Sequence, residues 1–274
     1  MEDELFVGTA VEERGEFEEA ADEDDGATDD EPGVAQANRV FDILDERADQ
    51  LEGLYPFTVE DEVTVRDDVD PRQSPYVVLL AITLAHAHDV ALEGDPTHVL
   101  EDAVTAALAA RGLLAVNVGA ISRQVKSEGL GFAETVDRCG KAAALQPSPD
   151  RAITLKYANE EGLDALGHLP WGDNRSGAWV FIGQATCGKS DGWSGKILQA
   201  KGHTWKLLLN VGVLPLAFLA VPHHVEPLHF GKLVQDSQNL VLDRLRLARY
   251  RVEVTATEVK VVDAVLEAGA EALA

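Results

Sequence analysis

Cysteine, lysine and long apolar runs are scarce in this sequence of 274 residues. Its two cysteines, Cys139 and Cys187, form no CxxC motif, which excludes a disulfide framework and a cysteine-ligated zinc site. No apolar run reaches the roughly 18 residues of a membrane span, and residues 1–19 contain neither the basic nor the apolar stretch of a secretory signal. We therefore expect a cytoplasmic protein that does not cross a membrane.

Positive charge is also in short supply, because 48 acidic side chains stand against 23 basic ones and the formal net charge is −25. Residues 1–34 hold fifteen of the acidic side chains and one basic one, so the remaining 240 residues carry only −11 of that charge. A high acidic charge with little lysine is typical of halophilic proteins, in which it keeps the surface solvated. Concentrated salt screens charges beyond a few ångströms, so the overall charge does not exclude DNA as a partner.

The pattern of residues divides the chain into three parts. Residues 1–33 are acidic and poor in aromatic residues, which predicts a disordered acidic tail. Residues 34–96 are predicted to form a helical extension, and residues 97–274 an α/β domain. Apolar residues at helical spacing, with Ser-Pro or Asp-Pro start signals in two cases, predict four helices before residue 147. These helices cover 34–54, 74–90, 95–113 and 129–145.

Beyond Pro149 the pattern changes to that of short strands. The third predicted strand is the clearest, because it is dense in aromatic and β-branched residues. A helix over 194–209 and a strand buried on both faces at 213–222 follow, and 239–250 fits either a strand or a helix. The sequence therefore predicts a mixed sheet flanked by helices, in the order helix, three strands, helix, strand. The three strands are predicted at 152–158, 163–169 and 178–187.

Three polar side chains are placed where a divalent metal could bind. Asp164 lies on or just before one predicted strand and Gln184 near the end of the next, so a hairpin would bring both to one edge of the sheet. Glu101, early in the preceding helix, could face the same place. Carboxylates and carbonyls are the ligands that Mg²⁺ or Mn²⁺ prefers. The alternatives are structural: Asp164 could cap a turn, Glu101 could stabilise its helix terminus, and Asp173 could compete as the metal carboxylate.

The segment E-G-L-D-A-L followed by V-F-I-G-Q-A-T resembles the Mrr-type branch of the PD-(D/E)XK nucleases. In that family a G-[IL]-D segment precedes a strand ending in Q-x-K or E-x-K, and an earlier helix supplies a glutamate. G-Q-A-T-C-G-K, with Trp193 and Lys196 behind it, is similar to a defence-associated group. The resemblance covers roughly residues 97–222. It implies a restriction-endonuclease-like core within 97–274, a metal-dependent DNA endonuclease activity, and a role in anti-phage defence.

The sequence departs from the family's pattern at Thr186, where the motif has lysine. Lys189 or Lys196 could supply the amine from the following loop or helix, and with Asp164 and Gln184 they make up the expected catalytic set. The departure equally fits a domain that has lost catalysis and binds DNA or partner proteins. A third hypothesis is an acidic structural protein whose tail binds a partner.

Basic residues outside the motif are candidates for contacts with DNA. We expect Arg244, Arg246 and Lys201 to contact phosphates, since a guanidinium can pair with a phosphate at two points. The alternative is that they pair with the abundant carboxylates of this chain. His223 and His224 follow a predicted strand and point in opposite directions, so at most one of them faces the site. Besides DNA, we expect other defence-system proteins and a second copy of the chain, in a homodimer, as partners.

Overall fold

The computed structural model describes residues 31–59, 63–157, 162–173, 175, 177–251 and 253–273. The predicted acidic tail lies outside these residues except for its last three, which begin the first described helix. Among the helices within these ranges, none combines the length and the apolar character needed to cross a membrane.

The N-terminal part contains helices and one small hairpin, as expected for a helical extension. Two of its helices begin where the sequence predicts: Ser74 caps α3 and Asp95 caps α4, and a proline occupies the first turn of each. Strands β1 and β2 pair antiparallel within this otherwise helical part. The elements are α2 (Glu31–Leu51), β1 (Phe57–Val59), β2 (Val63–Val65), α3 (Pro75–Ala87) and α4 (Pro96–Ala110).

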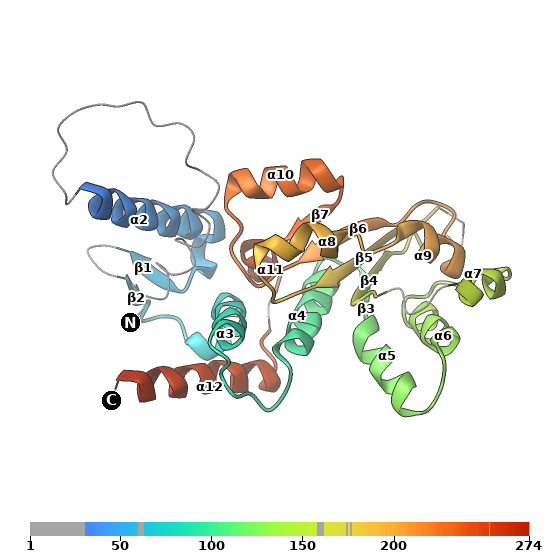
Figure 1. Ribbon diagram of the computed structural model, residues 1–274, viewed down its shortest axis with the longest axis horizontal. Coiled ribbons are helices and arrows are strands. Elements are labelled where there is room, and N and C mark those ends of the chain that lie inside the picture. Colours follow the sequence, from blue (N-terminus) through green and yellow to red (C-terminus); the bar gives the residue numbers. More distant parts are fainter. Residues whose placement is uncertain are drawn as a thin grey trace.

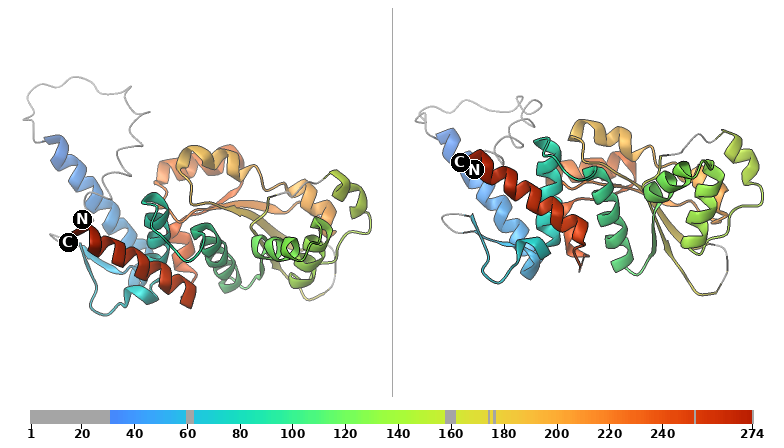
Figure 2. Two further views of the ribbon diagram at one scale, coloured as in Figure 1. Left: turned by 60° about the horizontal axis from the view of Figure 1, so that its bottom comes forward. Right: turned by 90° about the horizontal axis from the view of Figure 1, so that it is seen from below.

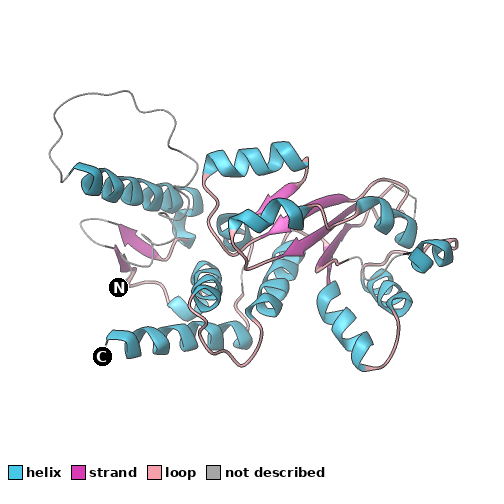
Figure 3. Ribbon diagram, in the orientation of Figure 1, coloured by secondary structure: helices cyan, strands magenta, loops and turns pink. Residues whose placement is uncertain are grey.

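A five-stranded mixed sheet forms the centre of the protein, in the spatial order β3-β4-β5-β6-β7 (Figures 1 and 3). The first three strands pair antiparallel, whereas β6 and β7 run parallel to β5. The α/β class with a mixed sheet flanked by helices is therefore confirmed. The strands are β3 (Leu114–Asn117), β4 (Ala165–Leu169), β5 (Trp179–Ala185), β6 (Leu216–Ala220) and β7 (Leu240–Leu242).

Helices cover both faces of this sheet, because successive strand residues point to opposite faces. Phe218 and Ala220 pack with α4 and α11 on one face of the sheet. Leu219 points to the other face, where it packs with α8 and α10. Figures 1 and 2 show α2 and α12 at one end of the long axis and α5, α6 and α7 at the other. These helices are α5 (Val118–Ser127), α6 (Phe132–Ala142), α7 (Arg151–Tyr157), α8 (Trp193–Ile197), α9 (Gly202–Leu209), α10 (Pro227–Ser237), α11 (Arg244–Arg249) and α12 (Ala256–Leu273).

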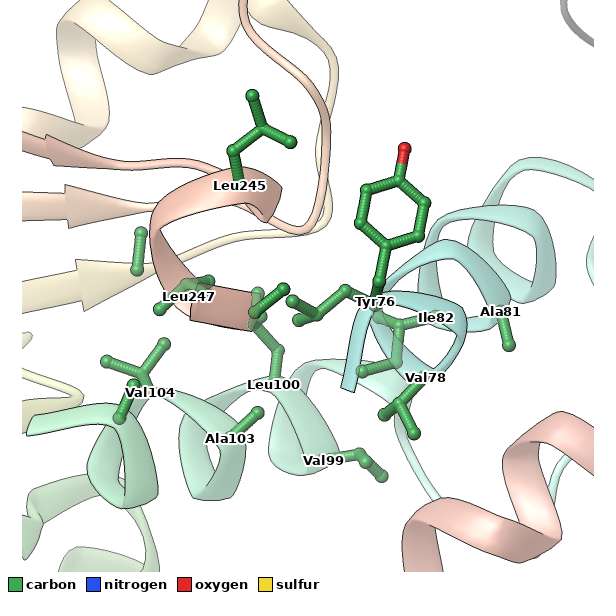
Figure 4. Packing of buried hydrophobic residues seen from close by; sticks show 14 of the residues in the cluster. Tyr76, Val78, Ala81, Ile82, Val99, Leu100, Ala103, Val104, Leu245 and Leu247 are labelled. Atoms are coloured by element: carbon green, nitrogen blue, oxygen red, sulfur yellow. The ribbon is translucent and has the colours of Figure 1, made fainter. Parts of the chain in front are cut away.

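One hydrophobic cluster joins the helical extension to the α/β part. Ile82 of α3, Leu100 of α4 and Leu247 of α11 all lie in it, and α12 packs against the same helices (Figure 4). The cluster therefore crosses the predicted boundary between residues 96 and 97. Separating the two parts would expose the apolar face of α4, which also packs on the sheet. For this reason the experiments below use the whole chain.

Three segments differ from their prediction. The segment predicted as a strand at 152–158 is instead helix α7, which follows the same Ser-Pro signal that starts α3, here at Ser148. Strand β3 and helix α5, which follow α4, were not predicted, since β3 has only four residues and Asn117 at its end already caps α5. The helix predicted at 194–209 is split into α8 and α9.

Candidate functional site

Asp164 lies at the junction of three elements, directly before β4. Its backbone N–H donates to the carbonyl of Gly183 in β5 (2.9 Å), and its carbonyl accepts from Val118 and Gly119 at the start of α5 (2.9 and 3.2 Å). Its side-chain Oδ2 accepts from the backbone N–H of Ala185 (2.7 Å). These bonds fix the carboxylate between β5 and α5, at the sheet edge that the sequence predicts.

Glu101 reaches the same place from α4. Its side chain is buried, with the residue 4% exposed, and both carboxylate oxygens accept from Arg123 of α5 (2.7 and 3.1 Å). A Cβ atom at Gly119 would lie 2.5 Å from Glu101 Oε2, so a larger residue at this position would displace the carboxylate. Glycine at the start of α5 therefore makes room for Glu101.

Asp164 and Glu101 line one pocket of about 210 Å³. Helix α5 contributes Gly119, Arg123 and Lys126 to the lining of the same pocket. The sequence predicted the two carboxylates but missed these cations, because it assigned no helix to 118–127. A signal was present, since residues 119, 122, 123 and 126 follow the spacing of one helix face. The remaining lining residues are Val118, Ser122, Phe132, Thr135, Gly162, Leu163 and Trp205.

The electrostatic surroundings of Asp164 favour a bound cation. Burial raises the pKa of its carboxyl, and the nearby negative charge of Glu101 acts in the same direction. The Ala185 N–H and the positive charges of Lys196 and Arg123 oppose this shift. Two carboxylates within electrostatic range of each other in a partly buried pocket repel, and a divalent cation would relieve that repulsion.

Gln184 lies beside this pocket but does not line it. The residue is 3% exposed, and its Nε2 has no hydrogen-bond partner among the described residues. A Cβ atom at Gly162, which does line the pocket, would be 3.5 Å from that nitrogen. The Gln184 amide is thus an unsatisfied polar group one residue layer behind the carboxylates, which is costly unless a ligand or water pairs with it.

The structure distinguishes the two lysines that could replace the motif lysine. Lys196 in α8 lies within electrostatic range of the Asp164 carboxylate. Lys189 is exposed on the turn before α8. Thr186 follows β5, and its hydroxyl accepts from the N–H of Gly188 (3.1 Å). Of the two candidates, Lys196 is therefore the one that the fold brings towards Asp164.

The three predicted DNA contacts lie in different surroundings. Arg244 is buried, and its guanidinium donates to the Pro222 carbonyl (2.8 Å) and the Thr83 hydroxyl (3.1 Å), so it takes no part in the proposal below. Arg246 is exposed, and its guanidinium carbon lies 4.4 Å from the ring centroid of Phe230. Lys201, which precedes α9, is exposed. None of the three lines the pocket.

His223 and His224 are half-buried and are held neutral. Burial lowers the pKa of His223 to about 4 and that of His224 to about 3. His223 Nε2 is 3.0 Å from the carbonyl oxygen of Cys187, whereas His224 Nδ1 has no partner among the described residues. Neither histidine lines the pocket.

The lowered pKa values of His223 and His224 predict that the folded protein loses stability in mild acid. The folded pKa values lie below the ordinary value of 6.5, so the unfolded chain binds protons first as the pH falls. The contribution of the two neutral histidines to the free energy of unfolding is fully present above about pH 6.5. It decreases as the pH falls towards 4, by on the order of 2 kcal/mol for each histidine. Urea unfolding at several pH values measures this slope. His224→Leu should flatten it and His203→Leu, at an exposed position on α9, should not; equal slopes in both variants would refute the assignment.

The side chains at the pocket suit a hard cation better than zinc. Mg²⁺ is commonly held by one or two carboxylates with several waters, and Asp164 and Glu101 supply that number. Gln184, which does not line the pocket, is not part of this set. Within the described parts of the chain there is no group of three or more His, Cys, Asp or Glu residues that could hold a metal. Any metal ion in this pocket would therefore have two carboxylates as its protein ligands and water for the remainder.

Comparisons with known proteins assign no family and no function to this chain. The fold is α/β, and the pocket combines two carboxylates with two cations. No protein-family model, curated protein or solved structure matches this chain.

Proposed function

We propose that this chain is a metal-dependent nuclease that hydrolyses phosphodiester bonds in DNA. The observation that carries the proposal is the convergence of Asp164 and Glu101 on one pocket that Arg123 and Lys126 also line. Carboxylates bind a hard cation, and a guanidinium or ammonium group binds phosphate. A pocket with both kinds of group suits a phosphodiester and the divalent metal that assists its cleavage.

Mg²⁺ or Mn²⁺ would be held by Asp164 and Glu101, with the Gln184 amide next to them. When bound, such an ion supplies Lewis-acid chemistry and a more acidic water. Arg123 and Lys126 bind and orient the phosphate from α5. Lys196 places a positive charge near Asp164, where it stabilises negative charge that develops on the phosphate.

The order of the elements supports a restriction-endonuclease-like core. Helix α4 carries Glu101 and precedes β3, and helices α5, α6 and α7 lie between β3 and β4 in the chain. The strands β3, β4 and β5 pair antiparallel in that spatial order, and β6 lies parallel to β5 after helices α8 and α9. Apart from the helices between β3 and β4, this order agrees with the helix, three strands, helix, strand order that the PD-(D/E)XK resemblance implies. We extend the proposal on that basis to an Mrr-type enzyme of an anti-phage system, with DNA and other defence proteins as partners.

A second candidate is a subunit that keeps this fold without catalysis and binds DNA or partner proteins. Two observations favour it. Thr186 stands at the position of the motif lysine, and Arg123 already neutralises the Glu101 carboxylate. Such a subunit would bind DNA through α5 without cleaving it.

Cleavage of plasmid DNA with Mg²⁺ or Mn²⁺, across a range of potassium chloride concentrations, separates the two candidates. We expect metal-dependent cleavage by the whole chain. Lys196→Ala should slow it by about a hundredfold, the usual effect of removing one group that stabilises transition-state charge. Lys189→Ala should retain most of the rate, because Lys189 is exposed on the turn before α8, whereas the charge of Lys196 acts on Asp164.

The opposite results have clear meanings. If Lys189→Ala loses cleavage and Lys196→Ala keeps it, the lysine assignment is reversed. If the folded wild-type chain binds DNA but leaves it intact under all these conditions, the non-catalytic subunit is the better account.

A further inference from the structure

The inner wall of the pocket contains polar groups that neither the metal site nor the phosphate contacts use. Thr135 of α6 and Trp205 of α9 both line the pocket and are 2% and 1% exposed. The indole Nε1 of Trp205 has no hydrogen-bond partner among the described residues, and the Thr135 hydroxyl makes no hydrogen bond with any of them. A buried indole N–H without a partner costs free energy, and a hydroxyl without a protein partner in the pocket lining is available to a bound ligand.

The same wall has an aromatic component. Phe132 lines the pocket beside Trp205, and the two rings meet edge to face with centroids 6.1 Å apart. An apolar ring surface next to a few hydrogen-bonding groups is the usual composition of a site for a flat heterocycle. The ligand chemistry indicated is therefore an aromatic base that bears hydrogen-bonding groups.

The size and charge of the pocket further restrict the class of ligand that it can bind. Its volume of about 210 Å³ corresponds to about seven water molecules at roughly 30 Å³ each, which suits one nucleoside and not a base pair. Arg123 and Lys126 line the same pocket and attract a phosphate. Base, sugar and phosphate groups can thus be accommodated by adjoining parts of one wall.

We propose that the pocket receives a single unpaired nucleotide of a DNA strand. Its phosphate contacts Arg123 and Lys126, and its base lies against Phe132, Thr135 and Trp205. This rests on the proposed nuclease function and specifies its substrate: single-stranded DNA, or a nucleotide turned out of a duplex next to the cleaved bond. An undistorted duplex does not satisfy the inner wall, because its bases are paired and stacked.

Calorimetric titration of the whole chain with deoxynucleoside monophosphates, short oligothymidylate and inorganic phosphate tests the binding. We expect the mononucleotide and the oligonucleotide to bind more tightly than phosphate. Thr135→Val should weaken both by about tenfold, the effect of one hydrogen bond to a ligand, while leaving the melting temperature unchanged or higher. If Thr135 had a purely structural role, Thr135→Val would instead lower the melting temperature and leave the affinity for nucleotides unchanged.

Thr83→Val is the matched control. Thr83 is equally buried, but its hydroxyl bonds the Leu79 and Pro222 carbonyls (3.0 Å each) and accepts from Arg244 (3.1 Å). This variant should melt at a lower temperature and bind nucleotides as the wild type does. The proposal fails if Thr135→Val binds like the wild type, if phosphate binds as well as the nucleotide, or if free mononucleotides bind and oligothymidylate does not.

Cleavage assays separate this proposal from the function on which it rests. Faster cleavage of single-stranded than of matched duplex DNA, with the preference reduced in Thr135→Val, supports both. Metal-dependent cleavage of duplex that is unaffected by Thr135→Val overturns the nucleotide site and leaves the nuclease. Binding of oligothymidylate that depends on Thr135, without any cleavage, supports the nucleotide site and overturns the nuclease.

Discussion

Asp164→Asn is expected to slow metal-dependent DNA cleavage by at least about a thousandfold. A metal contributes several kcal/mol of transition-state stabilisation, and about 1.4 kcal/mol corresponds to a tenfold change in rate. Asparagine keeps the size of the side chain and an oxygen that can accept from the Ala185 N–H, but it lacks the negative charge that holds the cation. Initial rates with saturating Mn²⁺ measure the effect.

The same substitution should leave the fold intact. Because burial raises the pKa of Asp164, the folded state disfavours its ionised form, and stability from this group falls as the pH rises from the unfolded value of 3.8 through the folded value. At neutral pH the uncharged asparagine should therefore melt at the same temperature as the wild type or above it. Loss of activity with retained stability identifies a functional carboxylate.

Asp173→Asn is the control for this experiment. Asp173 is the competing carboxylate in the sequence, and it is exposed in a turn, where it accepts from the backbone N–H of Arg175 (3.1 Å). Its replacement should leave cleavage unchanged. Full activity in Asp164→Asn, or a loss confined to Asp173→Asn, would remove Asp164 from the proposed metal site.

The position of Asp164 was predictable because its signals are local. A glycine-leucine-aspartate segment before a short apolar strand, followed by a turn and a strand rich in β-branched residues, places Asp164 and the end of β5 at one sheet edge. Glu101 was predictable only as a candidate, since its helix could have presented another face. Its burial depends on Gly119, eighteen residues further along the chain.

For helix α5 the local pattern was only a weak signal, the spacing of residues 119, 122, 123 and 126, and the position of Lys196 could not be derived from local pattern. The run from Val118 to Ser127 is short and largely polar, and its helical state depends on the Asn117 cap and on its position above Asp164. Lys196 approaches Asp164 because Trp193 is buried and donates through Nε1 to the Gly188 carbonyl (2.9 Å), which ties α8 to the end of β5. Contacts of this kind depend on tertiary packing.

Arg123→Gln is expected to lower the free energy of unfolding in the absence of metal and to make it more dependent on bound Mn²⁺. In the wild type the Arg123 guanidinium makes two hydrogen bonds to the buried Glu101 carboxylate. Breaking a buried ion pair costs about 3–5 kcal/mol, and the 38% exposure of the Arg123 side chain reduces this to about 1–3 kcal/mol. Urea unfolding in the presence of a chelator should show that loss.

Added Mn²⁺ should restore more stability to Arg123→Gln than it gives the wild type. In the variant the ion neutralises Glu101 without displacing a guanidinium, so it binds the folded state more tightly and stabilises it by mass action. Arg138→Gln is the control, because Arg138 on α6 forms ion pairs with Glu128 and Glu134, both of which are partly exposed. Its loss should have little effect on stability and none on the response to Mn²⁺.

The size of the Mn²⁺ response decides whether Glu101 is a ligand. If the ion stabilises Arg123→Gln and the wild type equally, it does not interact with Glu101, and Arg123 holds that carboxylate for the fold alone. If the variant gains more, Arg123 and the metal share one carboxylate. The guanidinium released when the ion binds is then available to the phosphate of the substrate, so that one residue neutralises Glu101 in the empty pocket and binds DNA in the loaded one.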